Sequence, residues 1–281
     1  GYGQWTDVVS VSSVGESLYN FYGFVCDGVY KDLEDLQTSP KPAKYPANGV
    51  FDRTNTVWVG DVKYKDISGP DGVPDGVIDD YDKTNIGSPM SKFTFGWTNT
   101  FRYKNFDLSV FINGSYGNKV YNYLSMKLTH MNSPWTNQLN AVNGRAQLVP
   151  INPNKVYEDG TMWYNDVSNV MVANPGASIP RATINDPNDN DRISDRYIED
   201  SSYIRLKNIS LGYTFPKKTI DKLGLSNLRI YANIQNLLTI TGYDGYDPEI
   251  GASTSSVNVY GLDNGRYPSP TVYSFGLNVS F

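Results

Sequence analysis

The sequence predicts an all-β protein, an antiparallel transmembrane β-barrel segment with short turns at one end and long loops at the other. Three observations predict this class: strands with one apolar and one polar face, connections that alternate between short and long, and many aromatic residues. The 281 residues include 22 Tyr, 11 Phe and 5 Trp, residues that suit strands and membrane interfaces. No apolar run approaches the ~18 residues of a membrane helix, which excludes a helical membrane protein.

The clearest strand is the last one, residues 273–281, in which every odd position is apolar and every even position is small or polar. Such alternation is typical of a transmembrane strand, because one face meets lipid and the other meets a wet lumen. Half-buried strands of water-soluble sheets alternate as well. This stretch alone therefore leaves both classes open, and the connections decide between them.

Other strands alternate in the same way. Residues 93–101 and 106–115 predict a hairpin, joined by only 102–105. Residues 203–215 predict a strand with a bulge near Lys207 and Asn208, because the apolar positions change phase there. A strand from Leu228 onward and a first β-rich segment at 18–30 complete about six readable strands.

Two short helical stretches are expected between the strands. Residues 216–224 suit one helical turn that begins with Pro216 and ends at Gly224. Residues 119–131 have a composition that suits a short helix. Residues 1–17 are mixed and predict either a strand or a linker.

The connection lengths alternate along the chain. From Leu18 onward they run long, short (102–105), very long, short (216–227) and long. Outer-membrane barrels have short periplasmic turns and long outer loops, whereas a soluble sandwich has no reason to separate lengths in this way. We therefore expect residues 31–92, 116–200 and 239–270 to be extracellular loops. About six strands are fewer than the roughly eight of the smallest barrels, so we expect more chain to precede Gly1.

Charge and single residues exclude several functions. The formal net charge is −5, and no Lys/Arg-rich stripe exists to neutralise phosphates, so no nucleic-acid partner is expected. The single cysteine, Cys26, cannot form an internal disulfide, and the single histidine, His130, cannot form a His-based metal site by itself. Because no nucleophile elbow, phosphate loop or zinc spacing is present, we do not expect an enzyme.

An acidic stretch is a candidate metal site. Its carboxylates, Asp71, Asp75, Asp79 and Asp82, fall at positions 1, 5, 9 and 12 of a calcium-loop register. Val73 stands where position 3 should supply a ligand, and Asp82 replaces the usual Glu. A bound Ca²⁺ and a solvated acidic turn both remain open.

Aromatic residues of the predicted outer loops are candidate substrate contacts, because flat rings stack on sugars or line peptide grooves. They are Trp135, Trp163, Tyr164, Tyr243 and Tyr246. The alternative is that these rings pack the loops. The polar faces of the strands are expected to line the lumen, with Asp107, Ser109, Arg205, Lys207, Arg229 and Gln235.

Five blocks of the sequence, in order, resemble the C-terminal part of SusC/RagA-like TonB-dependent transporters. They are residues 75–89, 95–109, 197–216, 228–237 and 246–249, and the resemblance extends from about Val14 onward. One block departs from the family pattern, because Ser68 stands in place of Asn and residues 70–74 look inserted.

This resemblance implies a Bacteroidetes-type importer of the bacterial outer membrane, a barrel of roughly 22 strands that takes up a glycan or an oligopeptide. Residues 1–281 would be the C-terminal part of that barrel, with the plug, the N-terminal strands and the contact to the TonB complex absent from this sequence. The implied partners are outer-membrane lipid and a SusD-like lipoprotein, which the loops 116–200 and 239–270 would contact. No cofactor is required, and binding of Ca²⁺ in the acidic loop remains open. Outer-membrane proteins of this kind typically present a C-terminal aromatic as an assembly signal, which here is Phe281.

The competing class is a soluble, calcium-stabilised carbohydrate-binding β-module. It would explain the aromatic residues and the acidic loop without a membrane. It explains neither the alternation of short turns with long loops nor a strand that runs to Phe281. Solubility separates the two, because the module would purify without detergent.

Overall fold

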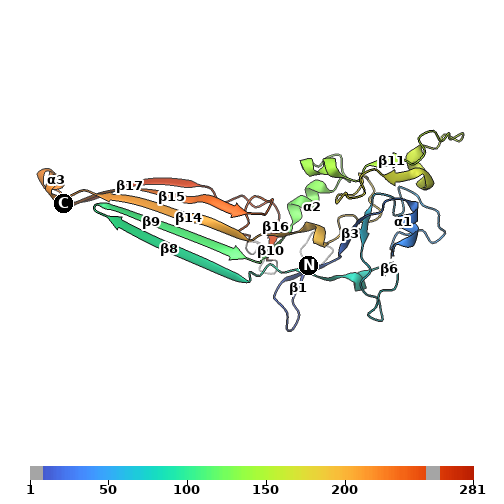
Figure 1. The fold of residues 1–281 in the computed structure, drawn as a ribbon, viewed down its shortest axis with the longest axis horizontal. Helices are drawn as coiled ribbons and strands as arrows, with labels where there is room; N and C mark the ends of the chain where they lie inside the picture. Colours follow the sequence, from blue (N-terminus) through green and yellow to red (C-terminus); the bar gives the residue numbers. More distant parts are fainter. Residues whose placement is uncertain (1–8, 251–259) are drawn as a thin grey trace. The chain divides into compact units, whose positions relative to one another are not determined.

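The computed structural model describes residues 9–250 and 260–281. The chain divides into two compact units. The first, here the mixed unit, comprises Gly1–Ser88 and Tyr121–Ile198, and the second, here the sheet unit, comprises Pro89–Val120 and Glu199–Phe281. Figure 1 shows the elements of both units in sequence colours.

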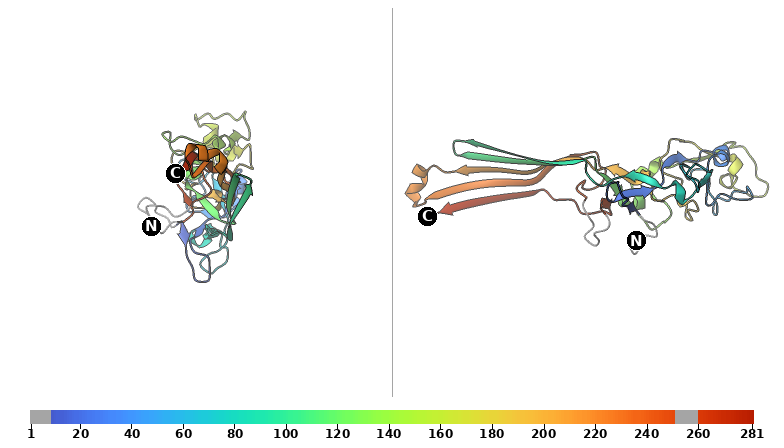
Figure 2. Two further views of the ribbon diagram at one scale, coloured as in Figure 1. Left: turned by 90° about the vertical axis from the view of Figure 1, so that its left-hand side faces the viewer. Right: turned by 90° about the horizontal axis from the view of Figure 1, so that it is seen from below.

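Five antiparallel strands form the main sheet of the sheet unit, in the spatial order β17-β15-β14-β9-β8. The strands are β8 (Phe93–Tyr103), β9 (Phe106–Tyr116), β14 (Tyr203–Thr214), β15 (Asn227–Thr241) and β17 (Val272–Ser280). They lie side by side in a single layer, the long sheet, as Figure 1 and the right-hand view of Figure 2 show. The predicted hairpin and the three later strands are thus confirmed, although β15 is longer than expected.

Both short connections are confirmed. Lys104 and Asn105 join β8 to β9, with Lys104 in the left-handed region at φ 53°. Between β14 and β15 lie the helical turn α3 (Lys217–Ile220) and the 3₁₀ turn η6 (Asp221–Leu223). Gly224 ends this segment at φ 69°, a conformation that glycine adopts without the steric cost of a Cβ.

The predicted bulge is also present. The register of β14 shifts between Leu206 and Asn208 in its pairing with both β15 and β9. On either side of the shift the two faces keep their character. One direct row of partners reads Phe101, Leu108, Leu211, Ala232 and Phe275, and the next reads Arg102, Asp107, Gly212, Tyr231 and Gly276. The long sheet therefore has one apolar and one polar face.

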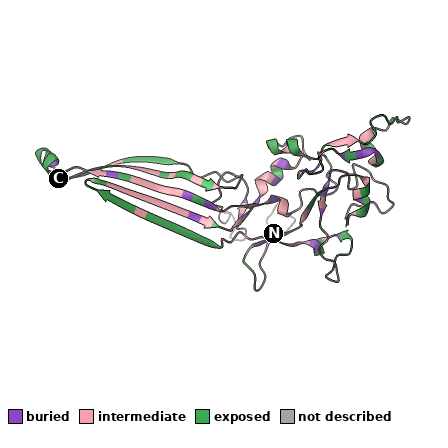
Figure 3. Cartoon of the chain, in the orientation of Figure 1, coloured by how far each residue is buried: buried purple, intermediate pink, exposed green. Residues whose placement is uncertain are grey.

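The apolar face is uncovered within the sheet unit. Trp97, Leu211 and Leu277 are 55%, 48% and 61% exposed, and Figure 3 shows exposed residues along β8 and β17. Burial of large apolar side chains normally stabilises a fold, so exposure on this scale indicates a face that meets an apolar environment. No helix in the described part of the chain is both long and apolar enough to cross a membrane.

The mixed unit contains short strands and turns. Its strands are β1 (Ser10–Val11), β2 (Asn20–Gly23), β3 (Cys26–Val29), β4 (Lys41–Pro42), β5 (Val62–Tyr64), β6 (Val77–Ile78), β7 (Thr84–Gly87), β11 (Leu148–Pro150) and β12 (Val170–Val172). Its helices are α1 (Leu33–Thr38) and α2 (Tyr123–Thr129), and its 3₁₀ turns are η1 (Asp80–Asp82), η2 (Asn140–Gly144), η3 (Trp163–Asn165), η4 (Val167–Asn169) and η5 (Asp195–Tyr197). The remaining short strands of the chain are β10 (Lys119–Asn122), β13 (Ile198–Asp200) and β16 (Leu262–Asp263). Helix α2 confirms the short helix expected at 119–131.

The mixed unit has its own hydrophobic core. Trp58 is fully buried at its centre, with Val57, Val59, Tyr30 and Val172 against it. Residues 31–92 and 116–200, expected as outer loops, therefore build most of a folded unit. The β-rich segment at 18–30 forms β2 and β3 of that unit, so the long sheet has five strands from this chain where about six were expected. The residues of this core are far apart in the sequence. They therefore produce no local hydrophobic periodicity from which the unit could be predicted.

Candidate functional site

A polar cavity of about 740 Å³ lies against the polar face of the long sheet. Its strand side includes Thr94, Ser115 and Tyr203, which are direct partners in one row across β8, β9 and β14. Lys207 at the bulge adds an ammonium group. Alternation places all four on the face where the sequence predicts a lumen.

The opposite side of the cavity comes from the connection between β15 and β17. Asp247 and Glu249 line it from the first described part of this connection, and Arg266, Tyr267 and Ser269 line it from the second. The connection thus folds back over the polar face of the strands that it joins. A predicted outer loop here forms one wall of a cavity.

Arg205 of β14 anchors this connection to the sheet. Its guanidinium is 2% exposed and donates from Nε to Thr239 Oγ1 at 2.9 Å, from Nη1 to Glu249 Oε2 at 2.8 Å and from Nη2 to Asp247 Oδ1 at 2.5 Å. Lys207 Nζ donates to the same Glu249 oxygen at 3.1 Å. Bidentate and charge-assisted bonds of this kind are among the stronger polar contacts in proteins.

Asp247 is held from several directions. Its carboxylate also accepts the backbone N–H of Glu249 at 3.0 Å and that of Ser269 at 3.0 Å, so it links both described parts of the connection. Burial raises the pKa of this carboxyl, but the two backbone donors and the Arg205 guanidinium outweigh it and bring the pKa to about 2. Asp247 is therefore ionised at neutral pH.

The predicted lumen residues share this polar face. Asp107 and Arg229 form an ion pair, with Nη2 to Oδ2 at 2.5 Å and Nε to Oδ1 at 3.2 Å. Ser109 is the direct partner of Ser210, and Gln235 is the direct partner of Asn208. Hydroxyls, amides and paired charges suit reversible binding of a polar ligand.

The predicted substrate contacts are distributed over both units. Trp135, which is 92% exposed, lies in the mixed unit together with Trp163 and Tyr164. Trp163 packs against the Trp58 core, and its ring meets that of Tyr164 edge to face at 5.6 Å. Of these three rings, only that of Trp135 is fully open to a ligand in this structure.

Tyr243 and Tyr246 lie in the sheet unit, but neither lines the cavity. Tyr243 is 5% exposed, its hydroxyl donates to Asp263 Oδ2 at 2.5 Å, and burial raises its pKa. Tyr246 is 64% exposed. The tyrosines that do line the cavity are Tyr203, Tyr260 and Tyr267. Sequence reasoning missed them, although the place of Tyr203 on the polar face of a strand was a usable signal.

The acidic stretch uses its carboxylates to hold its own backbone. Asp82 is fully buried and accepts the N–H groups of Ile67, Ser68 and Asp79. Asp79 in turn accepts the N–H of Tyr81 and begins the turn η1. Asp75 accepts the N–H of Val77, and Asp71 is exposed. Binding of Ca²⁺ at this stretch stays a prediction.

A different group brings metal-type donors together in the mixed unit. Among the described residues, His130, Asp186 and Asp191 place one ligand atom each within 4.8 Å of one another. His130 Nε2 lies 2.7 Å from Asp186 Oδ2, and Nδ1 lies 3.1 Å from Asp191 Oδ2. Because both ring nitrogens face carboxylates, a doubly protonated imidazolium satisfies this arrangement without a metal.

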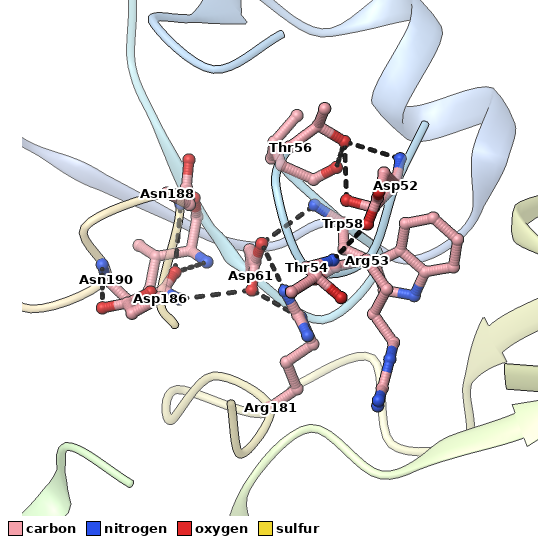
Figure 4. A network of polar contacts seen from close by, with 12 residues as sticks. Asp52, Arg53, Thr54, Thr56, Trp58, Asp61, Arg181, Asp186, Asn188 and Asn190 are labelled. Atoms are coloured by element: carbon pink, nitrogen blue, oxygen red, sulfur yellow. Dashed lines mark hydrogen bonds and ion pairs between the residues drawn. The ribbon is translucent and has the colours of Figure 1, made fainter. Parts of the chain in front are cut away.

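A buried polar network lies next to this histidine (Figure 4). Asp61 is fully buried and accepts from Arg181 Nε at 2.7 Å and from the backbone N–H of Trp58 at 2.8 Å. Asn190 donates to both Asp61 and Asp186, which continues the network to His130. The network joins the segment around Asp61 to the segment around Arg181, about 120 residues further along. The charged groups of Asp61 and Arg181 bind each other. It therefore serves the fold of the mixed unit.

Comparison with known proteins gives relatives of one kind. The TonB-dependent receptor P3 of Formosa agariphila is 32% identical over 272 residues, 95% of this chain and 22% of the receptor. The TonB-dependent receptor P26 of the same organism is 32% identical over 95% of this chain, and the TonB-dependent receptor SusC of Bacteroides thetaiotaomicron is 29% identical over 73% of it. The chain spans about a fifth of the length of these relatives. No family model matches it.

Solved structures show the same fold. The RagAB peptide transporter superposes with a TM-score of 0.63 at 18% identity, over 99% of this chain and 24% of that one. The RagAB peptide importer in its open-open state gives a TM-score of 0.60 at 18% identity, over 99% and 24%.

Fold and site together define a mostly β chain with a polar cavity on one face of a long sheet and an apolar surface on the other. Its relatives are of a single kind over nearly the whole chain. Over nearly its whole length the chain is similar to part of the TonB-dependent receptors, and over 73% of it to part of SusC.

Proposed function

We propose that this chain is the C-terminal part of a barrel that imports a glycan or an oligopeptide across the bacterial outer membrane. The observation that carries the proposal is the long sheet, which has an exposed apolar face from β8 to β17 and a polar face that lines a cavity. Lipid on one side and a wet passage on the other satisfy both faces at once. The relation to TonB-dependent receptors supports nutrient uptake as the purpose of the passage.

The two edges of the long sheet, β8 and β17, pair with no other strand of the described chain. Unpaired N–H and C=O groups are costly in lipid, so a strand outside these residues would pair with each edge to close a barrel. We propose that the remaining strands, the plug and the contact to the TonB complex belong to the rest of the receptor. TonB would supply the energy for uptake.

We further propose a SusD-like lipoprotein as the partner at the outer surface and Ca²⁺ as a ligand of the acidic stretch. The exposed ring of Trp135 and the exposed acidic side chains of Asp71 and Asp75 support surface roles for these segments. No catalytic role is proposed for this chain.

The test uses the full-length receptor in its own cell. Outer-membrane fractions should contain the receptor, and purification in mild detergent should retain the lipoprotein. Deletion of the gene should abolish growth on the glycan or oligopeptide that the receptor imports. Millimolar calcium should raise the melting temperature of the wild-type receptor, and Asp75→Asn should weaken this effect. Recovery of the receptor in the soluble fraction without detergent would favour the alternative, a soluble carbohydrate-binding module, and refute the importer.

A further inference from the structure

The charged side chains that line the cavity on the long sheet are the carboxylates of Asp247 and Glu249 and the cations of Lys207 and Arg266. The lining is therefore balanced in charge. Behind the wall, however, the buried guanidinium of Arg205 pairs with both carboxylates. This pairing leaves a lining cation without a carboxylate partner among the described residues.

The pairing of these charges can be followed atom by atom. Asp247 Oδ1 is taken by Arg205, and Glu249 Oε2 is shared between Arg205 and Lys207. Both carboxylates are thus engaged before any ligand arrives. Lys207 has only one of its three N–H donors committed in this way.

Arg266 is the cation without a partner. Within residues 9–250 and 260–281, its guanidinium makes no hydrogen bond or ion pair, and its side chain is exposed. Its backbone is nevertheless fixed, because its N–H and that of Gly265 both donate to the buried carboxylate of Asp263. Residues 251–259 contain no ionisable side chain that could pair with it. The cavity therefore presents a guanidinium that no described group engages, carried on a fixed backbone.

From these contacts we infer that the cavity binds a carboxylate carried by the ligand, with Arg266 as the principal contact and Lys207 as the second. This inference rests on the proposed import function and names the chemistry of its substrate. A guanidinium matches a carboxylate in two parallel N–H···O bonds. Tyr267 and Ser269 line the same wall and offer a ring and a hydroxyl to the uncharged part of the ligand.

The carboxylate has two natural sources, an acidic sugar of a glycan or the end of a peptide. The experiment measures binding of both to the detergent-purified full-length receptor by calorimetry. Trigalacturonate is compared with its trimethyl ester, and tetraalanine with tetraalanine amide. Within each pair the size is nearly constant and the negative charge is removed. We expect the acid of one pair to bind at least about tenfold more tightly than its neutral form, since a charge-assisted bond contributes on this scale.

Arg266→Gln should remove that preference, and Lys207→Gln should reduce it. The matched control is Lys222→Gln, which removes the same charge from η6, in the connection at the other end of β15, and should leave the preference unchanged. Equal affinity for acid and neutral forms, or no binding of either acid at millimolar concentration, would overturn the inference. The importer proposal would survive that result if the receptor still sorted to the outer membrane and supported growth.

Discussion

At the scale of single residues, His130 shows how a buried group makes a fold depend on pH. Burial lowers the pKa of this imidazole, but the carboxylates of Asp186 and Asp191 outweigh it and raise the pKa from 6.5 to about 9. Both carboxylates face the ring from the segment 186–191, and Lys127 of helix α2 acts on Asp191. The charged form of His130 is therefore stabilised by the native state.

The direction of the pH effect follows. Because the pKa is higher in the folded state, the stabilisation is fully present below about pH 6.5 and is lost as the pH rises through 9. At about 1.4 kcal/mol per pKa unit, the loss should be on the order of 3 kcal/mol. Hydrogen exchange of the amides in 123–191 of the full-length receptor should therefore accelerate between pH 6.5 and 9.5, after correction for intrinsic rates.

The control is His130→Gln, which keeps a polar side chain and does not titrate. Its exchange should show no such dependence and should resemble that of the wild type at high pH. If the wild-type protein were as stable at pH 9.5 as at pH 6.5, the imidazolium assignment would be wrong.

At the scale of elements, Arg205 decides where the connection between β15 and β17 lies. Replacing it with Met removes the partner of the buried Asp247 and of the half-exposed Glu249. Loss of one member of a buried pair typically costs about 3–5 kcal/mol. We therefore expect Arg205→Met to release the connection and so to allow trypsin to cleave the backbone after Arg266 in the full-length receptor.

Lys207→Met is the matched variant, because Lys207 contacts the same Glu249 from a more exposed position. Exposed ion pairs contribute about 0–1 kcal/mol, so cleavage at Arg266 should change little. Similar cleavage of both variants would mean that the connection is held by its packing. The pKa of Asp247, about 2, also predicts that neutral and mildly acidic buffers leave the wild-type connection in place.

The elements differ in how far the sequence predicts them. The strands of the long sheet follow from local alternation, and the bulge at Lys207 follows from a change of phase within one segment. The mixed unit has no such signal, since its strands are two to four residues long and depend on pairs such as Asp61 and Arg181. The cavity could not be predicted either, because it also depends on contacts between residues distant in sequence. Arg205 pairs with Asp247 and Glu249, which lie 42 and 44 residues further along the chain.

At the scale of the whole molecule, the end of the chain can be tested as an assembly signal. Phe281 follows the last residue of β17 and is 92% exposed. If the assembly machinery reads this ring, deleting Phe281 from the full-length receptor should sharply lower the amount of heat-modifiable barrel in the outer membrane. Val279→Ala trims the same face of the strand and should cost no more than a few kcal/mol of packing.

Gel shift of unheated outer-membrane samples measures the folded barrel directly. Equal and mild effects of the two changes would show that Phe281 only packs against lipid. A strong effect of the deletion alone would support recognition of the terminal ring.

The ion pair between Arg229 and Asp107 has a consequence for how a barrel built on this sheet would be wound. Arg229 belongs to β15 and Asp107 to β9, and the bond between them crosses β14 at Gly212. A Cβ at Gly212 would collide with the Arg229 guanidinium and with Asp107. If the pairing register of two strands shifted by one residue, every side chain would move to the opposite face, so the alternating pattern forbids that shift. A register shift of two residues keeps every side chain on its own face and is not forbidden by alternation. A slip of two would bring Ser210 or Thr214 into the place of Gly212, and their side chains would block the crossing. A single missing side chain thus favours one stagger of these three strands, and stagger is the quantity that would set the tilt and diameter of any barrel built on this sheet.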